Sequence, residues 1–499
     1  QSQPLYLGKF QVKEIQFPHG MVDTGENVTN VELVYAGQEV EVTETFTSFY
    51  NQRQKALVTL NKVLEQDETF GIGMNGEISA VTFGLYAQED ITAADGSVIP
   101  ADGLLEIVSV NENGQAVCST DLPFGSFYLK ELSTDSHYLL NGETFPFTFE
   151  YGGPSIAVVE ISANDGEAVT NELIRGEIKG LKTDENGTGL GGAVIGLFKS
   201  DETEFTAENA LATATSAEDG SFSFTNVPYG DWVLKELESP EGFILSDEVI
   251  PVTVEEDGQV VEISLANERV YGDLRLTKVD KDYPDNKLTG AEFEVYRDTN
   301  GNKELDEGDE LLGKLEETST GIYEMSHILY GGVFVRETKA PEGFLLDENA
   351  YYVEITENGK IYEVENEAGI GFTNMAQTGS LRIEKTSSDG KVEGFSFRVT
   401  GANGYDQTFK TDKNGEIFIE GLRVGDYTVS EVSDGASANY VLPADKKVTI
   451  LADKTTVAQM HNELRDTPKT GDDSKPWLWA ALMGVSAMGA AALGVAAYV

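Results

Sequence analysis

Apolar and polar residues alternate along much of the chain, with a period of two that is typical of β-strands. The run 272–278 places Leu274 and Leu276 on one face, and the run 291–295 repeats this spacing. Turn sequences such as Glu185-Asn-Gly separate the runs, because Asn and Gly accept the left-handed backbone angles of a tight turn. Short strands about 8 to 12 residues apart favour sandwiches, so we expect an all-β chain of tandem antiparallel β-sandwiches.

Charged residues recur on the side of the strands that should be buried. A Glu follows apolar residues two and four positions earlier, as Glu131 follows Leu129 and Phe127. Because successive side chains point to opposite faces of a sheet, such a Glu faces the core with its apolar neighbours. Lys residues follow the same rule. The residues in these positions are Glu14, Glu131, Glu236, Glu337 and Glu431, and Lys62, Lys182, Lys278 and Lys385.

An Asn stands eleven positions before each of these Lys residues. Each Lys lies 77 to 109 residues before the Asn that closes its own repeat, which is the length of one sandwich. The eleven-residue interval is then the seam between two domains. The Asn residues are Asn51, Asn171, Asn267, Asn374 and Asn462. We expect the C-terminal part of a truncated domain at 1–51, domains at 54–172, 174–268, 270–375 and 378–464, and a linker at 465–476.

A buried Lys beside a buried Glu has a specific chemical consequence. Burial lowers the pKa of a Lys and raises that of a Glu, by up to about 3 to 5 units, so the pair can exist as a neutral amine and a neutral acid. A neutral amine can attack a neighbouring Asn amide, while the acid polarises the carbonyl and passes protons to the departing ammonia. The alternative is an unrelated strand-end Lys, surface Glu and turn Asn. Four complete copies favour cross-links, without any cofactor, between Lys62 and Asn171, Lys182 and Asn267, Lys278 and Asn374, and Lys385 and Asn462.

Two motifs make the repeats resemble a known family. The opening Gly-x-apolar-x-apolar-x-Lys occurs at 272–278 and 379–385, and a Glu motif occurs in Val333-Phe-Val-Arg-Glu-Thr-Lys-Ala-Pro-Glu-Gly-Phe344 and again at 233–243. Over most of residues 1–465 the chain resembles the Cna B-type, SpaA-like pilin domains of Gram-positive surface proteins. The resemblance implies a prealbumin-like fold and autocatalytic Lys–Asn isopeptide bonds, with the Glu as proton shuttle. Ala56, Gly180 and the lack of a Pro after Glu131 and Glu431 depart from the family pattern.

The end of the chain carries two further signals. Residues 477–499 contain no charge, and a helix of that length spans roughly 35 Å, enough to cross a bilayer, so we expect one transmembrane helix. The five residues Thr467, Pro468, Lys469, Thr470 and Gly471 resemble a sortase sorting signal, although its usual first Leu is a Thr here and no basic tail follows Val499. The resemblance implies cleavage after Thr470, transfer to peptidoglycan or a pilus subunit, and an extracellular, wall-anchored protein that is membrane-bound only before sorting. Residues 1–10 lack the features of a signal peptide, so we expect the chain to begin inside a longer precursor.

Composition narrows the functional classes. A net charge of −51 excludes nucleic-acid binding, since nothing in the chain could neutralise phosphates. The single cysteine, Cys118, is expected to be a small buried residue, with a thioester to a Gln as the alternative. Four scattered His residues indicate no His-based metal site or catalytic triad. The positions of a calcium loop are partly matched by Asp298, Asn300, Asn302, Asp306 and Asp309, for which an acidic hairpin loop is the alternative.

The prediction is a structural protein, either a surface stalk that supports adhesion or a minor or basal pilin. Conventional turnover is not expected, because each proposed site would react once. A module that binds host matrix or glycan is the alternative from another class. A backbone pilin is a further one, for which the nearest polymerisation motif is Tyr283-Pro-Asp-Asn-Lys287, which also has the composition of a turn.

Overall fold

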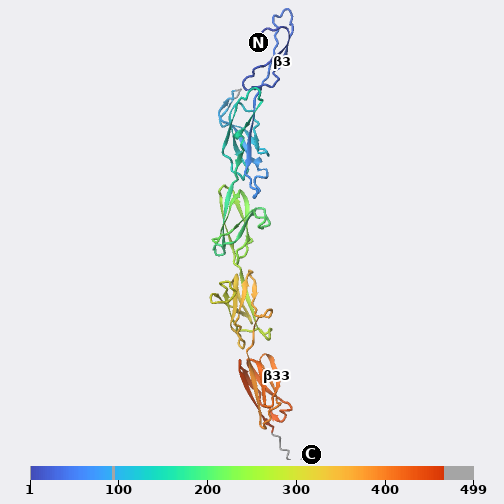
Figure 1. Ribbon diagram of the computed structural model, residues 1–499, viewed down its shortest axis with the longest axis vertical. Helices are drawn as coiled ribbons and strands as arrows, with labels where there is room; N and C mark the ends of the chain where they lie inside the picture. Colours follow the sequence, from blue (N-terminus) through green and yellow to red (C-terminus); the bar gives the residue numbers. More distant parts are fainter. Residues whose placement is uncertain (1, 93–95, 466–499) are drawn as a thin grey trace, which may run out of the picture. The chain divides into compact units, whose positions relative to one another are not determined.

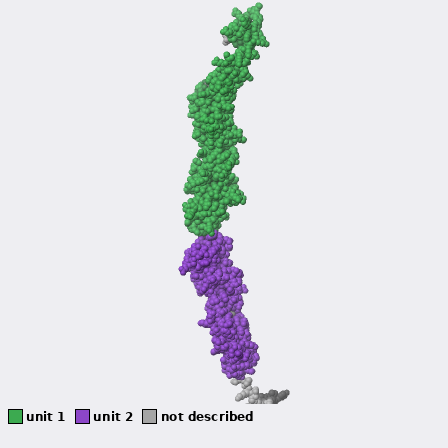
Figure 2. Space-filling model, in the orientation of Figure 1, with its two compact units in different colours: residues 1–269 green, residues 270–499 purple. Residues whose placement is uncertain are grey.

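The computed structural model describes residues 2–92 and 96–465, and Figure 1 shows them as strands joined by turns. They fall into two compact units, residues 1–269 and 270–499, which are coloured separately in Figure 2. The all-β prediction is confirmed for the described residues, whose helices are short 3-10 turns. In this part of the chain no helix is long and apolar enough to cross a membrane. The predicted transmembrane segment, residues 477–499, lies outside the described residues.

Unit 1 contains an N-terminal segment (residues 2–53), a first sandwich (54–171) and a second sandwich (175–267). The N-terminal segment has β1 Gly8–Lys13, β2 Met21–Val22, β3 Val28–Leu33 and β4 Gln52–Arg53. The first sandwich has β5 Lys55–Leu64, η1 Glu77–Ala80, β6 Thr82–Ala87, β7 Ile91–Thr92, β8 Val98–Ile99, β9 Leu104–Ser109, β10 Gln115–Val117, β11 Gly125–Ser133, β12 Thr144–Phe149, β13 Val158–Ser162, η2 Ala163–Gly166 and β14 Val169–Asn171. The second has β15 Arg175–Asp184, β16 Val194–Lys199, β17 Ala212–Thr215, β18 Ser221–Pro228, β19 Gly230–Glu238, β20 Val249–Val254 and β21 Val260–Asn267.

Unit 2 contains a third sandwich (271–374) and a fourth sandwich (378–464). The third has β22 Tyr271–Asp280, β23 Glu292–Arg297, β24 Glu310–Lys314, β25 Glu316–Ser319, β26 Ile322–Leu329, β27 Gly331–Lys339, β28 Ala350–Ile355, β29 Ile361–Glu363 and β30 Phe372–Asn374. The fourth has β31 Thr378–Ser387, β32 Ser396–Gly401, η3 Ala402–Gly404, β33 Tyr405–Lys410, β34 Glu416–Arg423, β35 Gly425–Val432, β36 Tyr440–Val441, β37 Lys446–Ile450 and β38 Thr455–Leu464.

Each sandwich has two sheets of its own, and their arrangement is similar in all four. One sheet has the first strand of the sandwich at its centre, as in the order β18-β15-β21 of the second sandwich. The other contains the Glu-bearing strand, as in β17-β16-β19-β20. Apolar residues of the two facing surfaces form a separate core in each sandwich, for example around Ile178, Leu197 and Leu234. Alternation along the strands therefore places Lys and Glu in facing sheets, with their side chains between them.

The first and last strands of each sandwich run parallel, which differs from the purely antiparallel arrangement expected from the sequence. In the second sandwich β15 pairs with β21 in parallel, and Asp184 lies opposite Asn267. The other three sandwiches repeat this register, so that the Asn always lies opposite the residue two positions after the Lys; the pairs are Leu64 with Asn171, Asp280 with Asn374 and Ser387 with Asn462. The crossover is long enough for a parallel pair because the rest of the sandwich lies between the two strands.

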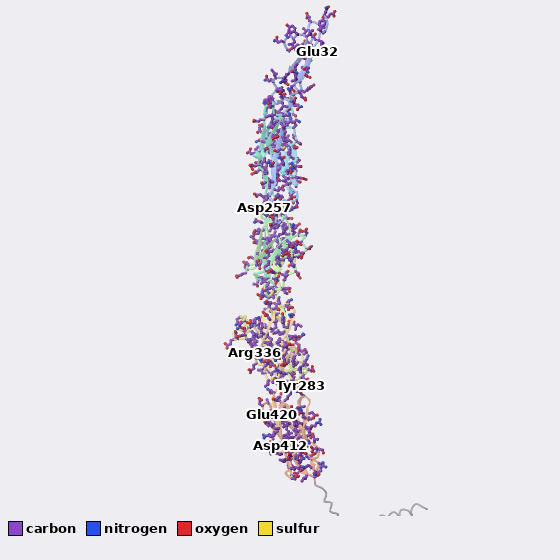
Figure 3. The ribbon with its side chains drawn as sticks, turned by 45° about the vertical axis from the view of Figure 1, so that its right-hand side comes forward. Glu32, Asp257, Tyr283, Arg336, Asp412 and Glu420 are labelled. Carbon is purple, nitrogen blue, oxygen red and sulfur yellow. The ribbon has the colours of Figure 1, made fainter. Side chains whose placement is uncertain are left out.

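Within each unit an Arg joins neighbouring sandwiches. In unit 1, Arg175 at the start of β15 lies 3.0 Å from both Glu65 and Asp67, which follow the first strand of the preceding sandwich. In unit 2, Arg423 of the fourth sandwich contacts Asp280 of the third and stacks 4.7 Å over the ring of Tyr283, a residue labelled in Figure 3. These bonds make the junctions ordered contacts, since charged Arg–carboxylate hydrogen bonds are stronger than neutral ones.

Candidate functional site

The structure buries the complete set of Lys, Glu and Asn residues singled out by their spacing in the four sandwiches. None of these twelve residues, four Lys, four Glu and four Asn, is more than 8% exposed. The Lys stands near the end of the first strand, the Asn at or near the end of the last strand, and the Glu in the facing sheet. Burying a charge without a partner is costly, so the Lys and the Glu of each core must contact each other or the Asn amide, or lose their charge.

In the first three sandwiches the Lys amine contacts the Asn amide. Lys62 Nζ donates a hydrogen bond to Asn171 Oδ1 at 2.7 Å, and the bonds from Lys182 to Asn267 and from Lys278 to Asn374 repeat it. The strand register explains this contact, because the parallel pairing of first and last strands brings both residues to the same end of the sheet. The sequence predicted these pairs, and the structure places the Lys amine and the Asn amide of each pair in contact.

The Glu holds the nitrogen of the same amide. Asn171 Nδ2 donates to Glu131 Oε1 at 2.6 Å, and the corresponding Asn267–Glu236 distance is 2.8 Å. The second oxygen of Glu131 accepts the backbone N–H of Asn141 at 3.0 Å. The loop ten residues after the Glu supplies this N–H again at Ser246 for Glu236 and at Asp347 for Glu337. The Glu therefore faces the amide nitrogen of the Asn, whereas the sequence also led us to expect it at the carbonyl oxygen.

The fourth sandwich has the same residues in a different arrangement. Asn462 Nδ2 donates to Glu431 Oε1 at 2.6 Å, as in the other sandwiches. Lys385 instead donates to the carbonyl of Thr386 and lies 4.2 Å from the centre of the Phe395 ring. Among the described residues, Asn462 Oδ1 has no hydrogen-bond partner. Rotation of the Lys side chain would supply the missing contact.

Burial shifts the protonation of these groups in the direction that nucleophilic attack requires. It lowers the pKa of Lys62 to about 8, although the negative charge of Glu131 opposes this change. It also raises the pKa of Glu131, against the hydrogen bond from Asn171 and the charge of Lys62. Both shifts bring the pair closer to a neutral amine beside a protonated carboxyl group than the same groups would be in water. The same directions hold for the pKa values of Lys182, Lys278, Lys385 and Glu431.

A glycine marks the start of the Glu strand, and it is not among the residues that we predicted from the sequence. A Gly stands six positions before every one of these Glu residues, and its φ lies between 110° and 158°, a range that side chains rarely adopt. The glycines are Gly125, Gly230, Gly331 and Gly425, with Gly8 in the same position before Glu14. The spacing is visible in the sequence, and it would have marked the start of these strands.

Other candidate residues lie away from these sites. Cys118 is buried, and burial raises the pKa of its thiol to about 12, which fits the buried-residue prediction and disfavours a reactive thiolate. The predicted sorting residues, 467–471, lie outside the described part of the chain. Tyr283 lies in a hydrogen-bonded turn that reaches Asn286, in agreement with the turn interpretation of that motif.

The acidic loop proposed for calcium is held by its own side chains. Asp306 Oδ2 accepts hydrogen bonds from Asn300 and Asn302, both at 2.9 Å, and Asp298 accepts backbone N–H groups of the loop. Among the described residues, no group of three or more His, Cys, Asp or Glu side chains is placed to hold a metal ion. Calcium binding here stays a prediction.

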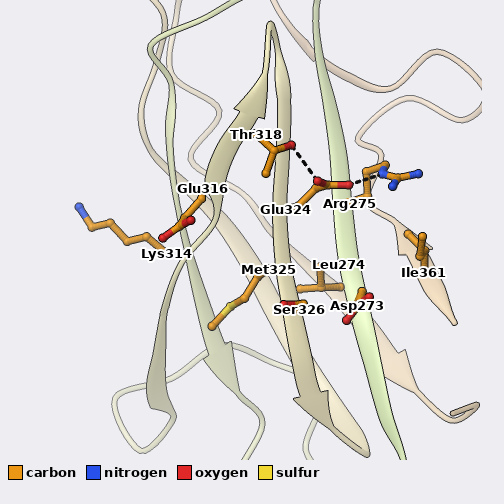
Figure 4. A pocket seen from close by; sticks show the side chains of 10 residues that line it. All are labelled: Asp273, Leu274, Arg275, Lys314, Glu316, Thr318, Glu324, Met325, Ser326 and Ile361. Atoms are coloured by element: carbon orange, nitrogen blue, oxygen red, sulfur yellow. Dashed lines mark hydrogen bonds and ion pairs between the residues drawn. The ribbon is translucent and has the colours of Figure 1, made fainter. Parts of the chain in front are cut away.

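An open pocket of about 450 Å³ lies on the third sandwich (Figure 4). Two of its charged residues are paired with each other: Glu324 accepts a hydrogen bond from Arg275 at 2.6 Å, and it accepts another from Thr318 at 2.7 Å. The pocket lies on the solvent side of β22, because Arg275 and the buried Lys278 point to opposite faces of that strand. It is therefore separate from the buried Lys, Glu and Asn.

Comparison with known proteins identifies the domain type. The family described as SpaA, a prealbumin-like fold domain, matches residues 176–269, 272–368 and 379–464, together more than half of the chain. Similar solved structures include the Bacillus anthracis TIE protein, with 21% identity, coverage of 77% of this chain and 69% of that chain, and a TM-score of 0.49. They also include BcpA, the major pilin subunit of Bacillus cereus, with 14% identity, coverage of 58% and 99%, and a TM-score of 0.30. GBS52, the minor pilin of Streptococcus agalactiae, has 14% identity, coverage of 59% and 98%, and a TM-score of 0.18.

No curated protein matches the chain. The family match covers the second, third and fourth sandwiches, whose paired sheets and buried Lys, Glu and Asn are described above. The chain belongs to the SpaA family of prealbumin-like fold domains.

Proposed function

We propose that the chain is a structural subunit of a Gram-positive surface stalk or a minor or basal pilin, in which each sandwich is locked by an autocatalytic Lys–Asn amide bond. The domains are the intervals 54–172, 174–268, 270–375 and 378–464. The observation that carries the proposal is the contact of Lys Nζ with the Asn amide oxygen, while the Glu holds the amide nitrogen, as in Lys62, Asn171 and Glu131.

The reaction needs no group from outside the site. The neutral amine of Lys62 attacks Cγ of Asn171, the bond between Cγ and Nδ2 breaks, and ammonia leaves. Glu131 takes a proton from Nζ and delivers one to Nδ2, with which it is already hydrogen-bonded. The products are a secondary amide and ammonia, so atoms and charge balance. The buried ammonium and carboxylate no longer have to coexist, because the amide is neutral.

The location of the bond explains what it would do for the protein. Tension reaches a sandwich at the beginning of its first strand and leaves after its last strand. Lys182 and Asn267 are 85 positions apart, and a bond between them joins the far ends of these parallel strands, so the residues between them carry no load. Backbone hydrogen bonds contribute only about 1 kcal/mol each, whereas a covalent amide does not yield to such forces. Resistance to extension would be the function of the repeats.

Intact mass tests this function. The chain should be lighter than its sequence by four ammonia molecules, and peptide mapping should find the four Lys–Asn pairs joined. Substitution of Asn171 by Ala should restore one ammonia and leave the other three bonds intact. A chain of full sequence mass would rule out the cross-linking function.

Anchoring to the cell wall is the second part of the proposal. Thr467 to Gly471 would be the sorting signal, and residues 477–499 would hold the chain in the membrane until a sortase transfers it to peptidoglycan or to a pilus subunit. Incubation with a sortase and an amine nucleophile should remove the residues after Thr470. A Thr470→Ala chain should stay uncleaved; equal cleavage of both chains would contradict the assignment of this signal.

A further inference from the structure

The amide nitrogen of Asn171 has a second acceptor besides Glu131. Asn171 Nδ2 donates to Glu131 Oε1 at 2.6 Å and to Thr134 Oγ1 at 2.9 Å. These two bonds use both hydrogens of the amide nitrogen, and the amide oxygen accepts the Lys62 amine at 2.7 Å. Each polar atom of the amide therefore has a partner, and the plane of the amide is fixed in the first sandwich.

The contact with the Glu is common to all the Asn amides of this kind. A Glu oxygen accepts the Asn nitrogen in each of the four sandwiches. It does so in the N-terminal segment as well, where Asn51 Nδ2 donates to Glu14 Oε1 at 3.1 Å. In the third sandwich both oxygens of Glu337 accept the nitrogen of Asn374. The carboxylate is thus the general partner of the amide nitrogen.

The hydroxyl contact is specific to the first sandwich. Thr134 stands three positions after its Glu, where the other sandwiches have Ser239, Ala340 and Asp434. The hydroxyl of Ser239 donates to a backbone carbonyl, and the carboxylate of Asp434 accepts backbone N–H groups of its own loop. Ala340 has no hydrogen-bonding side chain. Among the described residues, only the first sandwich therefore has a hydroxyl on the nitrogen of its Asn.

The loop that carries Thr134 is tied to the chain that follows Asn171. The N–H of Ile174 donates to the carbonyl of His137 at 2.8 Å, and these two residues lie three positions after Asn171 and Thr134 respectively. A second backbone hydrogen bond of 2.9 Å, from Leu139 N–H, joins the same two segments. The backbone therefore holds the hydroxyl beside the amide without help from the Lys.

We propose that Thr134 is a catalytic residue of the first sandwich, which holds the departing nitrogen of Asn171 while Glu131 moves the proton. Glu131 accepts an N–H of this nitrogen before the reaction, but it has to donate a proton to the nitrogen when the bond to Cγ breaks. During that exchange the hydroxyl oxygen is the acceptor that still fixes the nitrogen. The inference rests on the proposed cross-linking function and adds a fourth group to one of its sites.

The hydroxyl takes part without gaining or losing a proton. Nζ of Lys62 bonds to Cγ of Asn171, one proton passes from Nζ through Glu131 to Nδ2, and ammonia leaves with the electron pair of the Cγ–Nδ2 bond. Thr134 Oγ1 only accepts an N–H of the leaving nitrogen. No oxidant or further reactant is needed.

The test compares Thr134→Val with Thr134→Ser in the full chain, made by cell-free synthesis so that the age of each chain is known. Val keeps the branched shape of Thr without the hydroxyl, whereas Ser keeps the hydroxyl. Intact mass and peptide mapping give the closed fraction of each sandwich against time. We expect the first sandwich to close about tenfold more slowly in Thr134→Val, the factor that one hydrogen bond made in the transition state supplies. Thr134→Ser should restore a rate near that of the wild type.

The other three sandwiches are the controls within each chain, and their closure rates should be the same in all three chains. Closure of the first sandwich in Thr134→Val should be slow but complete, because its Lys, Glu and Asn are intact. Equal rates in the wild type and Thr134→Val, equally slow closure in both variants, or closure that stops short of completion would overturn the inference. If the other sandwiches have lost ammonia in the same spectra, that failure leaves the proposed function intact.

Discussion

Substitution of Glu337 by Gln separates the cross-linking chemistry from the packing of the third sandwich. Gln has nearly the volume of Glu, but it cannot relay a proton between Lys278 and Asn374. Glu337 accepts two hydrogen bonds from Asn374, at 2.9 and 3.0 Å, and it is buried. We expect the amide bond of this sandwich to be absent and one ammonia to be restored to the mass of the chain, with the other three bonds unaffected.

The loss of stability follows from the size of the loop that the bond closes. Lys278 and Asn374 are 96 positions apart. Closing a loop of about 100 residues removes chain entropy from the unfolded state that is worth about 4.7 kcal/mol in the chain-entropy treatment of cross-links. At about 4 to 8 °C per kcal/mol for a domain of this size, the melting temperature of the third sandwich should fall by about 20 to 40 °C.

The open sandwich should also respond to pH. Burial lowers the pKa of Lys278 from 10.5 to about 8 against the opposing charge of Glu337. Glu337→Gln removes that opposition, so the pKa of Lys278 in the open sandwich lies no higher than about 8. The folded state then binds fewer protons than the unfolded state between these values, so stability should rise with pH across this window. In the closed wild-type sandwich the amine no longer titrates, and this dependence should be absent.

Calorimetry and intact mass of the same samples test the reasoning. Glu342→Gln, at an exposed position in the loop that follows, is the matched control and should change neither measurement. In a Lys278→Met background, which cannot form the bond, Glu337→Gln should cost much less than in the wild type. A variant that has lost the bond but melts within a few degrees of the wild type would refute the stabilising role. Normal ammonia loss in Glu337→Gln would refute the role of the carboxyl group.

Three further outcomes are expected. In refolding experiments followed by mass, the rate at which the first sandwich forms its bond should have a bell-shaped pH profile, because the reaction needs neutral Lys62 together with protonated Glu131. The rate should fall above about pH 8 and again at acid pH. A rate that keeps rising above about pH 8 would contradict the proton relay. Arg423→Ala should lower the free energy of unfolding by about 3 kcal/mol, because it leaves the buried carboxylate of Asp280 without its cation. Limited proteolysis should then cut between the third and fourth sandwiches. Unchanged proteolysis would show that the ion pair does not order the junction. If the acidic loop binds calcium, the melting temperature should rise with calcium over chelator in the wild type and not in Asp306→Ala, whereas identical melting in calcium and chelator would remove the site.

The burial of the Lys, Glu and Asn residues could be predicted from the sequence because it depends on two signals that are local or strictly periodic. Alternation fixes which face of a strand carries Glu131 or Lys278, and the constant interval between Asn and the next Lys fixes the seam between domains. The same reasoning could not predict the partner of a strand. The parallel pairing of β15 with β21 joins residues more than 80 positions apart, and a period of two is the same for parallel and antiparallel neighbours.

Long-range contacts between side chains also escaped the sequence. Arg175 and Arg423 bind carboxylates of the preceding sandwich, but the first does so from the start of β15 and the second from the end of β34, 143 positions after Asp280. No common spacing connects them. The orientation of Lys385 toward Thr386 is a choice of rotamer at a position that is buried as predicted, and alternation does not address rotamers.

The parallel pair connects the chemistry with the mechanics of the fold. Lys182 stands seven residues after the start of β15, so an antiparallel last strand would bring its terminal Asn toward that start, roughly 23 Å from the amine at about 3.3 Å per residue. No rotation of a Lys side chain covers this distance. A parallel last strand brings Asn267 to the end of β15 that holds the Lys, and it also lets the chain leave the sandwich at the end opposite to where it began. The geometry that permits the bond is therefore the geometry that places the bond on the path of an applied force.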